Sequence, residues 1–182
     1  CHSSWSDGGS PLEEMMITAH ALGHEYCAIT DHSPRLQVAR GLSADRLRNQ
    51  MAVVADLNTV MAPFRCLRGI EVDILEDGGL DQDDELLAEL DVVVSSVHSK
   101  LRSDSETMTH RMVGGIANPR TNVLGHCTGR LIQGERGLRP QSVFDAEVVF
   151  EACRTFSVAV EINSRPERRD PPTRLLHMAI EM

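Results

Sequence analysis

Apolar and polar positions alternate along the chain in segments that predict helices and strands in turn. Apolar residues recur with a period near 3.6 at Leu47, Met51 and Val54, which is typical of an amphipathic helix. Short apolar runs that end in polar residues, such as Tyr26–Ile29, are typical of strands. The pattern predicts helices over residues 10–22, 43–61, 104–117, 142–154 and 175–182, a short acidic helix after 78–79, and strands over 26–29, 64–74, 91–98, 122–124 and 158–162.

Local signals mark several of these boundaries. Ser10-Pro11 followed by Glu13 predicts a helix start with Ser10 as the N-cap. Residues 142–145 are expected to cap the helix that follows them. The three consecutive valines at 92–94 predict a strand that is buried on both faces, as in a parallel sheet.

Residue types that can bind a metal lie at or just beyond the carboxyl ends of successive predicted strands. In an α/β barrel these ends converge on one mouth, whereas an open doubly wound sheet gathers them from two or three strands only. We therefore expect an α/β barrel, because such residues lie at or just beyond the ends of five predicted strands: His32, Glu71, His98, His126 and Asn163.

Composition and charge narrow the class of protein. A length of 182 residues fits one domain, and an aromatic content of 3% predicts an aliphatic core. The formal net charge of −9 argues against a broad basic surface for duplex nucleic acid. Apolar runs are shorter than the roughly 18 residues of a membrane span, so no membrane association is expected. Since the chain begins at Cys1 and its last predicted helix reaches Met182, we expect a fragment of a longer protein.

The five cysteines include no CxxC pair. Cys27, Cys66 and Cys153 lie in apolar stretches and are expected to be buried, reduced thiols. Reduced thiols are typical of a cytoplasmic protein, which is the localisation that we expect.

Four imidazoles and two carboxylates are the candidate metal ligands. Such a mixed set suits zinc, manganese or iron better than calcium. Histidines on predicted helices or helix ends are expected to be structural: His20, His24, His110 and His177. The candidate ligands lie near the start of the chain or after predicted strands: His2, Asp7, His32, Glu71, His98 and His126.

Five short motifs occur in an order that matches a known family: His2-Ser3 with Ser6-Asp7-Gly8, Thr30-Asp31-His32-Ser33, Gly69-Ile70-Glu71, Ser96-Val97-His98-Ser99 and Leu124-Gly125-His126. Over nearly its whole length the chain resembles the PHP (polymerase and histidinol phosphatase) superfamily. It is most similar to stand-alone bacterial PHP phosphoesterases and to the C-terminal PHP domain of family X DNA polymerases. The resemblance implies a distorted seven-stranded (β/α) barrel, TIM-like, whose mouth holds two to three divalent ions (Zn, Mn or Fe).

The resemblance also implies how the candidate ligands divide among the metals. Glu71 would bridge the first and second ions. The other five would each serve one ion: His2 the first, His98 and His126 the second, and Asp7 and His32 the third.

Two parts of the family pattern are expected to fall outside the chain. The first histidine of the opening His-x-His motif would precede Cys1, and no closing Asp-x-His motif occurs before Met182. The resemblance therefore implies a PHP domain over residues 1–182 that is truncated at both ends.

The activity implied by the resemblance is metal-dependent hydrolysis of phosphoric esters, of the phosphatase or 3′-5′ exonuclease type. Glu71 and His98 would act through a metal-activated hydroxide. The expected partner is a phosphorylated small molecule or a nucleic acid 3′ end, and no protein partner is indicated. Cationic side chains just past the proposed ligands or strand ends are candidates for substrate binding: Arg35, Lys100 and Arg165.

Two other functions stay open at this point. The chain could be a PHP-fold structural or interaction module without activity, or a metal-dependent hydrolase of amide or ester bonds. Loops at a barrel mouth set specificity, so the fold alone does not identify the physiological substrate.

Overall fold

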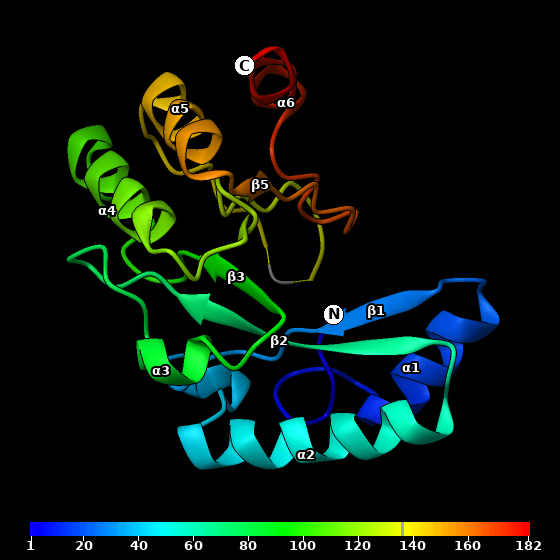
Figure 1. Ribbon diagram of the computed structural model, residues 1–182. Coiled ribbons are helices and arrows are strands. Elements are labelled where there is room, and N and C mark those ends of the chain that lie inside the picture. Colours follow the sequence, from blue (N-terminus) through cyan, green and yellow to red (C-terminus); the bar gives the residue numbers. More distant parts are fainter. Residues whose placement is uncertain (136) are drawn as a thin grey trace. The chain divides into compact units, whose positions relative to one another are not determined.

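The computed structural model describes residues 1–135 and 137–182, which form an α/β fold (Figure 1). The five strands follow the order β1-β2-β3-β4-β5. Their bounds are β1 Tyr26–Ile29, β2 Arg65–Asp73, β3 Val92–Ser96, β4 Val123–Leu124 and β5 Ala159–Val160. The helices are α1 Leu12–Ala21, η1 Gln37–Ala39, α2 Ala44–Val60, α3 Asp84–Leu87, α4 Ser105–Ala117, α5 Ala146–Phe156 and α6 Thr173–Glu181.

The predicted alternation of strands and helices is confirmed, and each strand lies within a segment that the pattern assigned to a strand. The resemblance to the PHP superfamily implied a seven-stranded barrel, and the residues that the structure describes form five strands. In β3, Val93 is buried while Val92 and Val94 are half-buried, so burial on both faces is only partial.

The start of α1 differs from the prediction. Pro11 is the N-cap and makes no side-chain capping hydrogen bond. The carbonyl of Ser10 instead accepts a hydrogen bond of 2.8 Å from the backbone N–H of Ser4. Ser10 therefore closes the opening segment of the chain rather than capping the helix.

The start of α5 is shifted within the predicted capping segment. Asp145 is the N-cap, and its side chain accepts a hydrogen bond from the backbone N–H of Val148. Ser142 does not cap, since its hydroxyl donates to the carbonyl of Leu101 at 2.9 Å.

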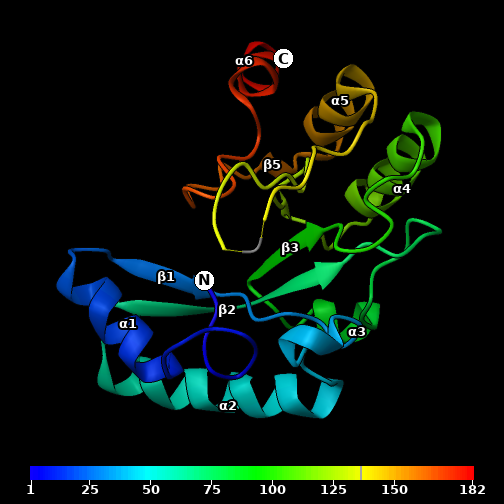
Figure 2. The same ribbon diagram turned by 180° about the vertical axis from the view of Figure 1, so that it is seen from behind.

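The chain divides into two compact units, called unit 1 (Cys1–Val72 and Asp81–Val93) and unit 2 (Asp73–Leu80 and Val94–Met182). In unit 1, β1 pairs with β2 in parallel, with Tyr26 opposite Arg65. Helices α1 and α2 lie on one face of this pair (Figure 2). The core between them is mainly aliphatic and includes Leu12, Met16 and Val54, all at most 1% exposed.

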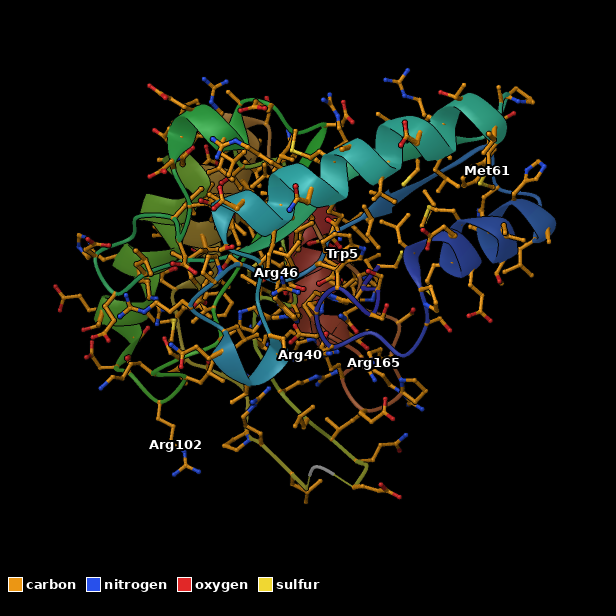
Figure 3. All side chains as sticks on the ribbon, turned by 90° about the horizontal axis from the view of Figure 1, so that it is seen from below. Trp5, Arg40, Arg46, Met61, Arg102 and Arg165 are labelled. Carbon is orange, nitrogen blue, oxygen red and sulfur yellow. The ribbon has the colours of Figure 1, made fainter. Side chains whose placement is uncertain are left out.

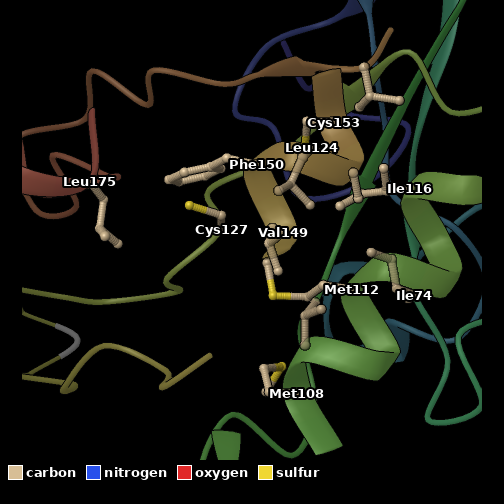
Figure 4. Packing of buried hydrophobic residues seen from close by; sticks show 13 residues of the cluster. Ile74, Met108, Met112, Ile116, Leu124, Cys127, Val149, Phe150, Cys153 and Leu175 are labelled. Carbon is tan, nitrogen blue, oxygen red and sulfur yellow. The ribbon is translucent and has the colours of Figure 1, made fainter. Parts of the chain in front are cut away.

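In unit 2, β3 pairs with β4 and β4 pairs with β5, both in parallel. Helices α4 and α5 pack against each other. The core is built mostly from aliphatic and sulfur-containing side chains, with Phe150 as the aromatic member of its buried set (Figure 4). The prediction of an aliphatic core is therefore confirmed in both units.

Burial of the cysteines follows the prediction with one exception. Cys66 and Cys153 are buried, whereas Cys27 is only half-buried. Within the described part of the chain, no helix has the length and apolar character that a membrane span requires.

Candidate metal centre

The opening segment of unit 1 forms a tight turn that carries His2 and Asp7. The carbonyl of Ser3 accepts hydrogen bonds from the backbone N–H groups of Ser6 at 3.1 Å and Gly8 at 2.9 Å. A Cβ atom at Gly8 would lie 2.6 Å from backbone atoms of His2 and Ser3, so only glycine fits there without displacing the backbone. Local backbone hydrogen bonds thus contribute to the shape of the turn that carries His2 and Asp7.

His32 and Glu71 come from neighbouring strands that continue the β1–β2 pairing. The two residues form a parallel bridge. The N–H of Ser33 donates to the carbonyl of Glu71, and the N–H of Glu71 donates to the carbonyl of Asp31, both at 3.0 Å. Partners in a parallel bridge present their side chains on the same face, which places this imidazole beside this carboxylate.

These four residues of unit 1 bring their donor atoms together. His2 Nε2 lies 3.1 Å from Glu71 Oε2, and His32 Nδ1 lies 3.7 Å from the same oxygen. Asp7 Oδ1 lies 3.6 Å from His32 Nε2 and 3.9 Å from His2 Nδ1. The two imidazole rings stack with their centroids 4.5 Å apart.

The geometry of this cluster fits a divalent metal ion. Ligands about 2.1 Å from one ion stand about 3.4 Å apart in a tetrahedral site, and Glu71 Oε2 lies 3.1 Å from His2 Nε2 and 3.7 Å from His32 Nδ1. One ligand atom from each of His2, His32 and Glu71 lies within 4.8 Å of the others. In the part of the chain that the structure describes, the buried Nδ1 of His2 has no hydrogen-bond partner, and an ion would satisfy such an atom. The nitrogen and carboxylate donors suit zinc, manganese or iron.

A second pair of imidazoles lies in unit 2, where His98 follows β3 and His126 follows β4. Their ring centroids are 5.1 Å apart in an edge-to-face arrangement. Gly125, just before His126, packs against β3: a Cβ atom there would lie 2.2 Å from Ser96 Oγ. The strands therefore bring these two imidazoles together through close packing of β4 on β3.

Asp73, at the end of β2, orients His98. One carboxylate oxygen of Asp73 lies 3.0 Å from the backbone N of His98 and 3.3 Å from its Nδ1. A carboxylate beside one ring nitrogen holds the imidazole so that Nε2 can face a metal. The backbone N–H of His126 donates to another carboxylate, that of Glu161.

The predicted cationic residues lie at exposed positions. The backbone N–H of Arg35 donates to Asp81 at 2.6 Å, and its side chain is exposed. Lys100 is exposed and adopts a left-handed backbone conformation with φ of 52°. Arg165 lines a cavity of about 360 Å³ in unit 2 together with Glu135, Glu167 and others. These carboxylates offset part of the positive charge at that cavity.

The four histidines predicted to be structural take no part in either cluster, as far as the described residues show. His20 packs on the ring of Phe64, with centroids 5.4 Å apart. Sequence reasoning missed two carboxylates, Asp31 and Asp73. The two-residue spacing of Glu71 and Asp73 on one strand could have revealed the second, because alternate strand residues share a face.

The buried cysteines are unsuited to metal binding or nucleophilic attack. Burial raises the pKa of the Cys66 and Cys153 thiols to about 12, and raises the pKa of Cys127 well above its usual range. Thiolate is the form that binds metal and attacks electrophiles. Near neutral pH these three side chains are therefore inert thiols, and the candidate chemistry rests on imidazoles and carboxylates.

Comparison with known proteins gives consistent matches. The PHP domain family model matches residues 1–164. The DNA polymerase/3'-5' exonuclease PolX of Bacillus subtilis is 40% identical over 180 residues, which cover 99% of this chain and 31% of the relative. A probable phosphatase of Caldicellulosiruptor bescii is 28% identical over 168 residues, covering 90% of this chain and 63% of the relative.

A further probable phosphatase, from Acetivibrio thermocellus, is 29% identical over 158 residues, covering 85% of this chain and 59% of the relative. The chain thus spans between 31% and 63% of the length of these relatives.

Proposed function

The chain belongs to the PHP domain family, and on this premise we propose that it is a metal-dependent phosphoesterase. The observation that carries the proposal is the convergence of His2, His32, Glu71 and Asp7 at separations suited to metal ligands. The names of the relatives, a polymerase/exonuclease and two probable phosphatases, support chemistry on phosphoric esters.

The proposed cofactors are two to three divalent ions, zinc, manganese or iron. In unit 1 the proposed ligands are His2, Asp7, His32 and Glu71, and in unit 2 they are His98 and His126. Such ions would supply Lewis-acid chemistry, neutralising charge on the phosphate oxygens and lowering the pKa of water. We assign the catalytic roles to Glu71 and His98 through the ions that they would hold.

The substrates that we propose are phosphomonoesters and the 3′-terminal phosphodiester of a nucleic acid. Arg35, Lys100 and Arg165 are proposed to bind the substrate phosphate. An arginine can donate two parallel hydrogen bonds to phosphate oxygens, whereas lysine acts as a point charge. The exposure of all three side chains leaves them accessible to a substrate in solution.

The proposed setting is a PHP domain over residues 1–182, with a distorted seven-stranded barrel and a cytoplasmic location. The five parallel strands are compatible with part of such a barrel. The five free cysteines of the described residues are compatible with a reducing compartment.

A hydrolysis assay tests the proposed function. Purified protein is loaded with Mn²⁺ or Zn²⁺ and given either an aryl phosphate or an oligonucleotide labelled at its 3′ end. We expect hydrolysis of at least one substrate, loss of activity on treatment with a chelator, and recovery when the metal is restored. If neither substrate is hydrolysed by the metal-loaded protein, the proposal fails, and a cyclic amide or lactone would be the next substrate to try.

A further inference from the structure

Asp31 is a buried carboxylate of unit 1. Its residue is only 1% exposed, so its charge must be satisfied inside the protein. It accepts hydrogen bonds from the backbone N–H of Ser3 at 2.8 Å, the hydroxyl of Ser3 at 2.7 Å and the side-chain amide of Gln50 at 2.6 Å. The hydroxyl of Ser6 donates to it as well.

Two residues that donate to Asp31, Ser3 and Ser6, flank proposed metal ligands. Ser3 directly follows His2, and Ser6 directly precedes Asp7, so one carboxylate holds both ends of the ligand-bearing turn. Asp31 also precedes His32, and its backbone carbonyl accepts the N–H of Glu71 at 3.0 Å. Asp31 is therefore linked to all four proposed ligands of unit 1. It is adjacent to His32 in the sequence, it hydrogen-bonds to Glu71 through its backbone, and its carboxylate binds the serines next to His2 and Asp7.

Two arginines strengthen the same turn through its backbone. Arg40 donates to the carbonyl of Ser6, and Arg46 donates to the carbonyl of Trp5. Figure 3 shows both guanidinium side chains beside the turn that contains Trp5. Neither arginine pairs with Asp31, and within the described residues that carboxylate has only neutral donors. Its role is thus to accept several directed hydrogen bonds rather than to form an ion pair.

We propose that Asp31 is a positioning residue that sets the separation of His2 and Asp7 for metal binding. The proposal rests on the proposed metal site, since Asp31 itself is not a ligand. A carboxylate that accepts from Ser3 and Ser6 at once fixes the turn in one conformation before the metal arrives. Without it, both hydroxyls and the Ser3 N–H would lose their shared acceptor, and the two ligands would be free to separate.

The test compares metal affinity in matched variants by competition with a chromophoric chelator, using Mn²⁺ and Zn²⁺ alone. Asp31→Ala is expected to weaken binding at the unit 1 cluster by about 10- to 100-fold, the range for partners that orient metal ligands. The matched control is Asp91→Asn, which changes a carboxylate of unit 1 that binds Arg68 and contacts none of the ligands. Its metal affinity should stay within about twofold of the unaltered protein, because only stability depends on that ion pair.

A second variant keeps the proposal testable if Asp31→Ala does not fold. Ser3→Ala combined with Ser6→Ala removes both hydroxyl donors but leaves the carboxylate bound to the Ser3 N–H and to Gln50. This variant should fold and still bind metal about tenfold more weakly. Folded variants with unchanged affinity would overturn the proposal.

The outcome also separates this inference from the proposed function. Metal affinity is measured without a substrate, so weakened binding in the variants supports the positioning role even if no phosphoester is hydrolysed. If the unaltered protein binds neither ion, the proposed function and the positioning role fail together. If it binds metal and hydrolyses a phosphoester but the variants bind as tightly, only the positioning role fails.

Discussion

The two clusters of proposed ligands are held in place by different means. In unit 1, His2 and Asp7 lie on a turn whose shape depends on side chains, above all on Asp31. In unit 2, His98 and His126 follow adjacent parallel strands, and carboxylates bind their backbone N–H groups. The positions of ligands on a turn held by side chains depend on a few specific residues. The positions of ligands at strand ends depend on the pairing and packing of the whole sheet.

This difference predicts unequal tolerance to substitution. Changes at Ser3, Ser6 or Asp31 should disturb the proposed metal site of unit 1 without unfolding the core. In unit 2, the imidazoles should move when the packing of β4 on β3 is disturbed or when the carboxylates that bind their backbone N–H groups are removed.

Replacement of Glu71 should have the largest effect on activity. Glu71→Gln keeps the shape of the side chain but removes the charge that would bind a cation. We expect activity to fall by more than about 100-fold, since even indirect partners of a metal are worth 10- to 100-fold. Initial rates with the better phosphoester measure the loss, with His177→Gln as the control that should leave the rate unchanged. Turnover near the normal level in Glu71→Gln would contradict the ligand assignment.

Replacing one glycine in each unit with alanine compares how much each ligand-bearing segment tolerates an added Cβ atom. The free energy of unfolding is the quantity compared. At Gly8 a Cβ atom would meet backbone atoms of His2 and Ser3 at 2.6 Å, and backbone cannot easily move aside. At Gly125 it would meet the side chains of Ser96 and Val94, which can rotate. We expect Gly8→Ala to lower the free energy of unfolding by about 3 kcal/mol and Gly125→Ala by about 1 kcal/mol.

Urea unfolding measures both losses. Equal losses of unfolding free energy would show that the turn of unit 1 accommodates an added Cβ atom as easily as the strand end of unit 2 does.

Removal of the Asp73 carboxylate tests orientation in unit 2. Asp73→Asn would weaken its hold on the ring and backbone of His98. We expect metal bound through His98 to be held about tenfold more weakly, with little change in stability. Chelator competition measures the affinity, and an unchanged value in a folded variant would mean that the strands alone orient this imidazole.

The smallest expected effect is that of Asp91→Asn on the free energy of unfolding and on how that free energy depends on pH. Hydrogen bonds from Arg68 lower the pKa of Asp91, so this carboxylate stabilises the folded state when it is charged. Because the pair is partly exposed, Asp91→Asn should reduce the free energy of unfolding by less than about 1 kcal/mol at pH 7. That contribution is present above the unfolded pKa of about 3.9 and is lost as the pH falls through the lowered folded pKa.

Urea unfolding at pH 7 and near pH 3 measures this dependence. The difference between the two proteins should shrink at the lower pH. A difference that stays constant would show that the Asp91 charge is not its source.

Much of the fold could be predicted because its signals are local. The periodic apolar positions of α2 and the polar residues after each strand placed the elements and the candidate ligands. The predicted N-cap of α1 was wrong: Pro11 is the N-cap, and the carbonyl of Ser10 accepts a hydrogen bond from Ser4 in the opening turn. Local capping rules do not take account of the conformation of the turn that precedes a helix.

The hydrogen bonds of Asp31, on which its proposed role rests, could not be predicted either, because they join distant parts of the chain. Its partners Ser3 and Gln50 are 28 and 19 residues away, and their convergence appears only when β1, α2 and the opening turn are packed together. Asp73 was within reach of sequence reasoning, because its two-residue offset from Glu71 already places both carboxylates on one side of a strand.

The most direct test of the account is the number of metal ions bound per chain. Purified protein is equilibrated with Mn²⁺ or Zn²⁺, freed of unbound metal and measured by elemental analysis. Ligand clusters in both units predict at least two ions per chain, falling when Glu71 or His98 is replaced. A content of one ion or none, unchanged in those variants, would contradict the metal assignment on which the proposed phosphoesterase rests.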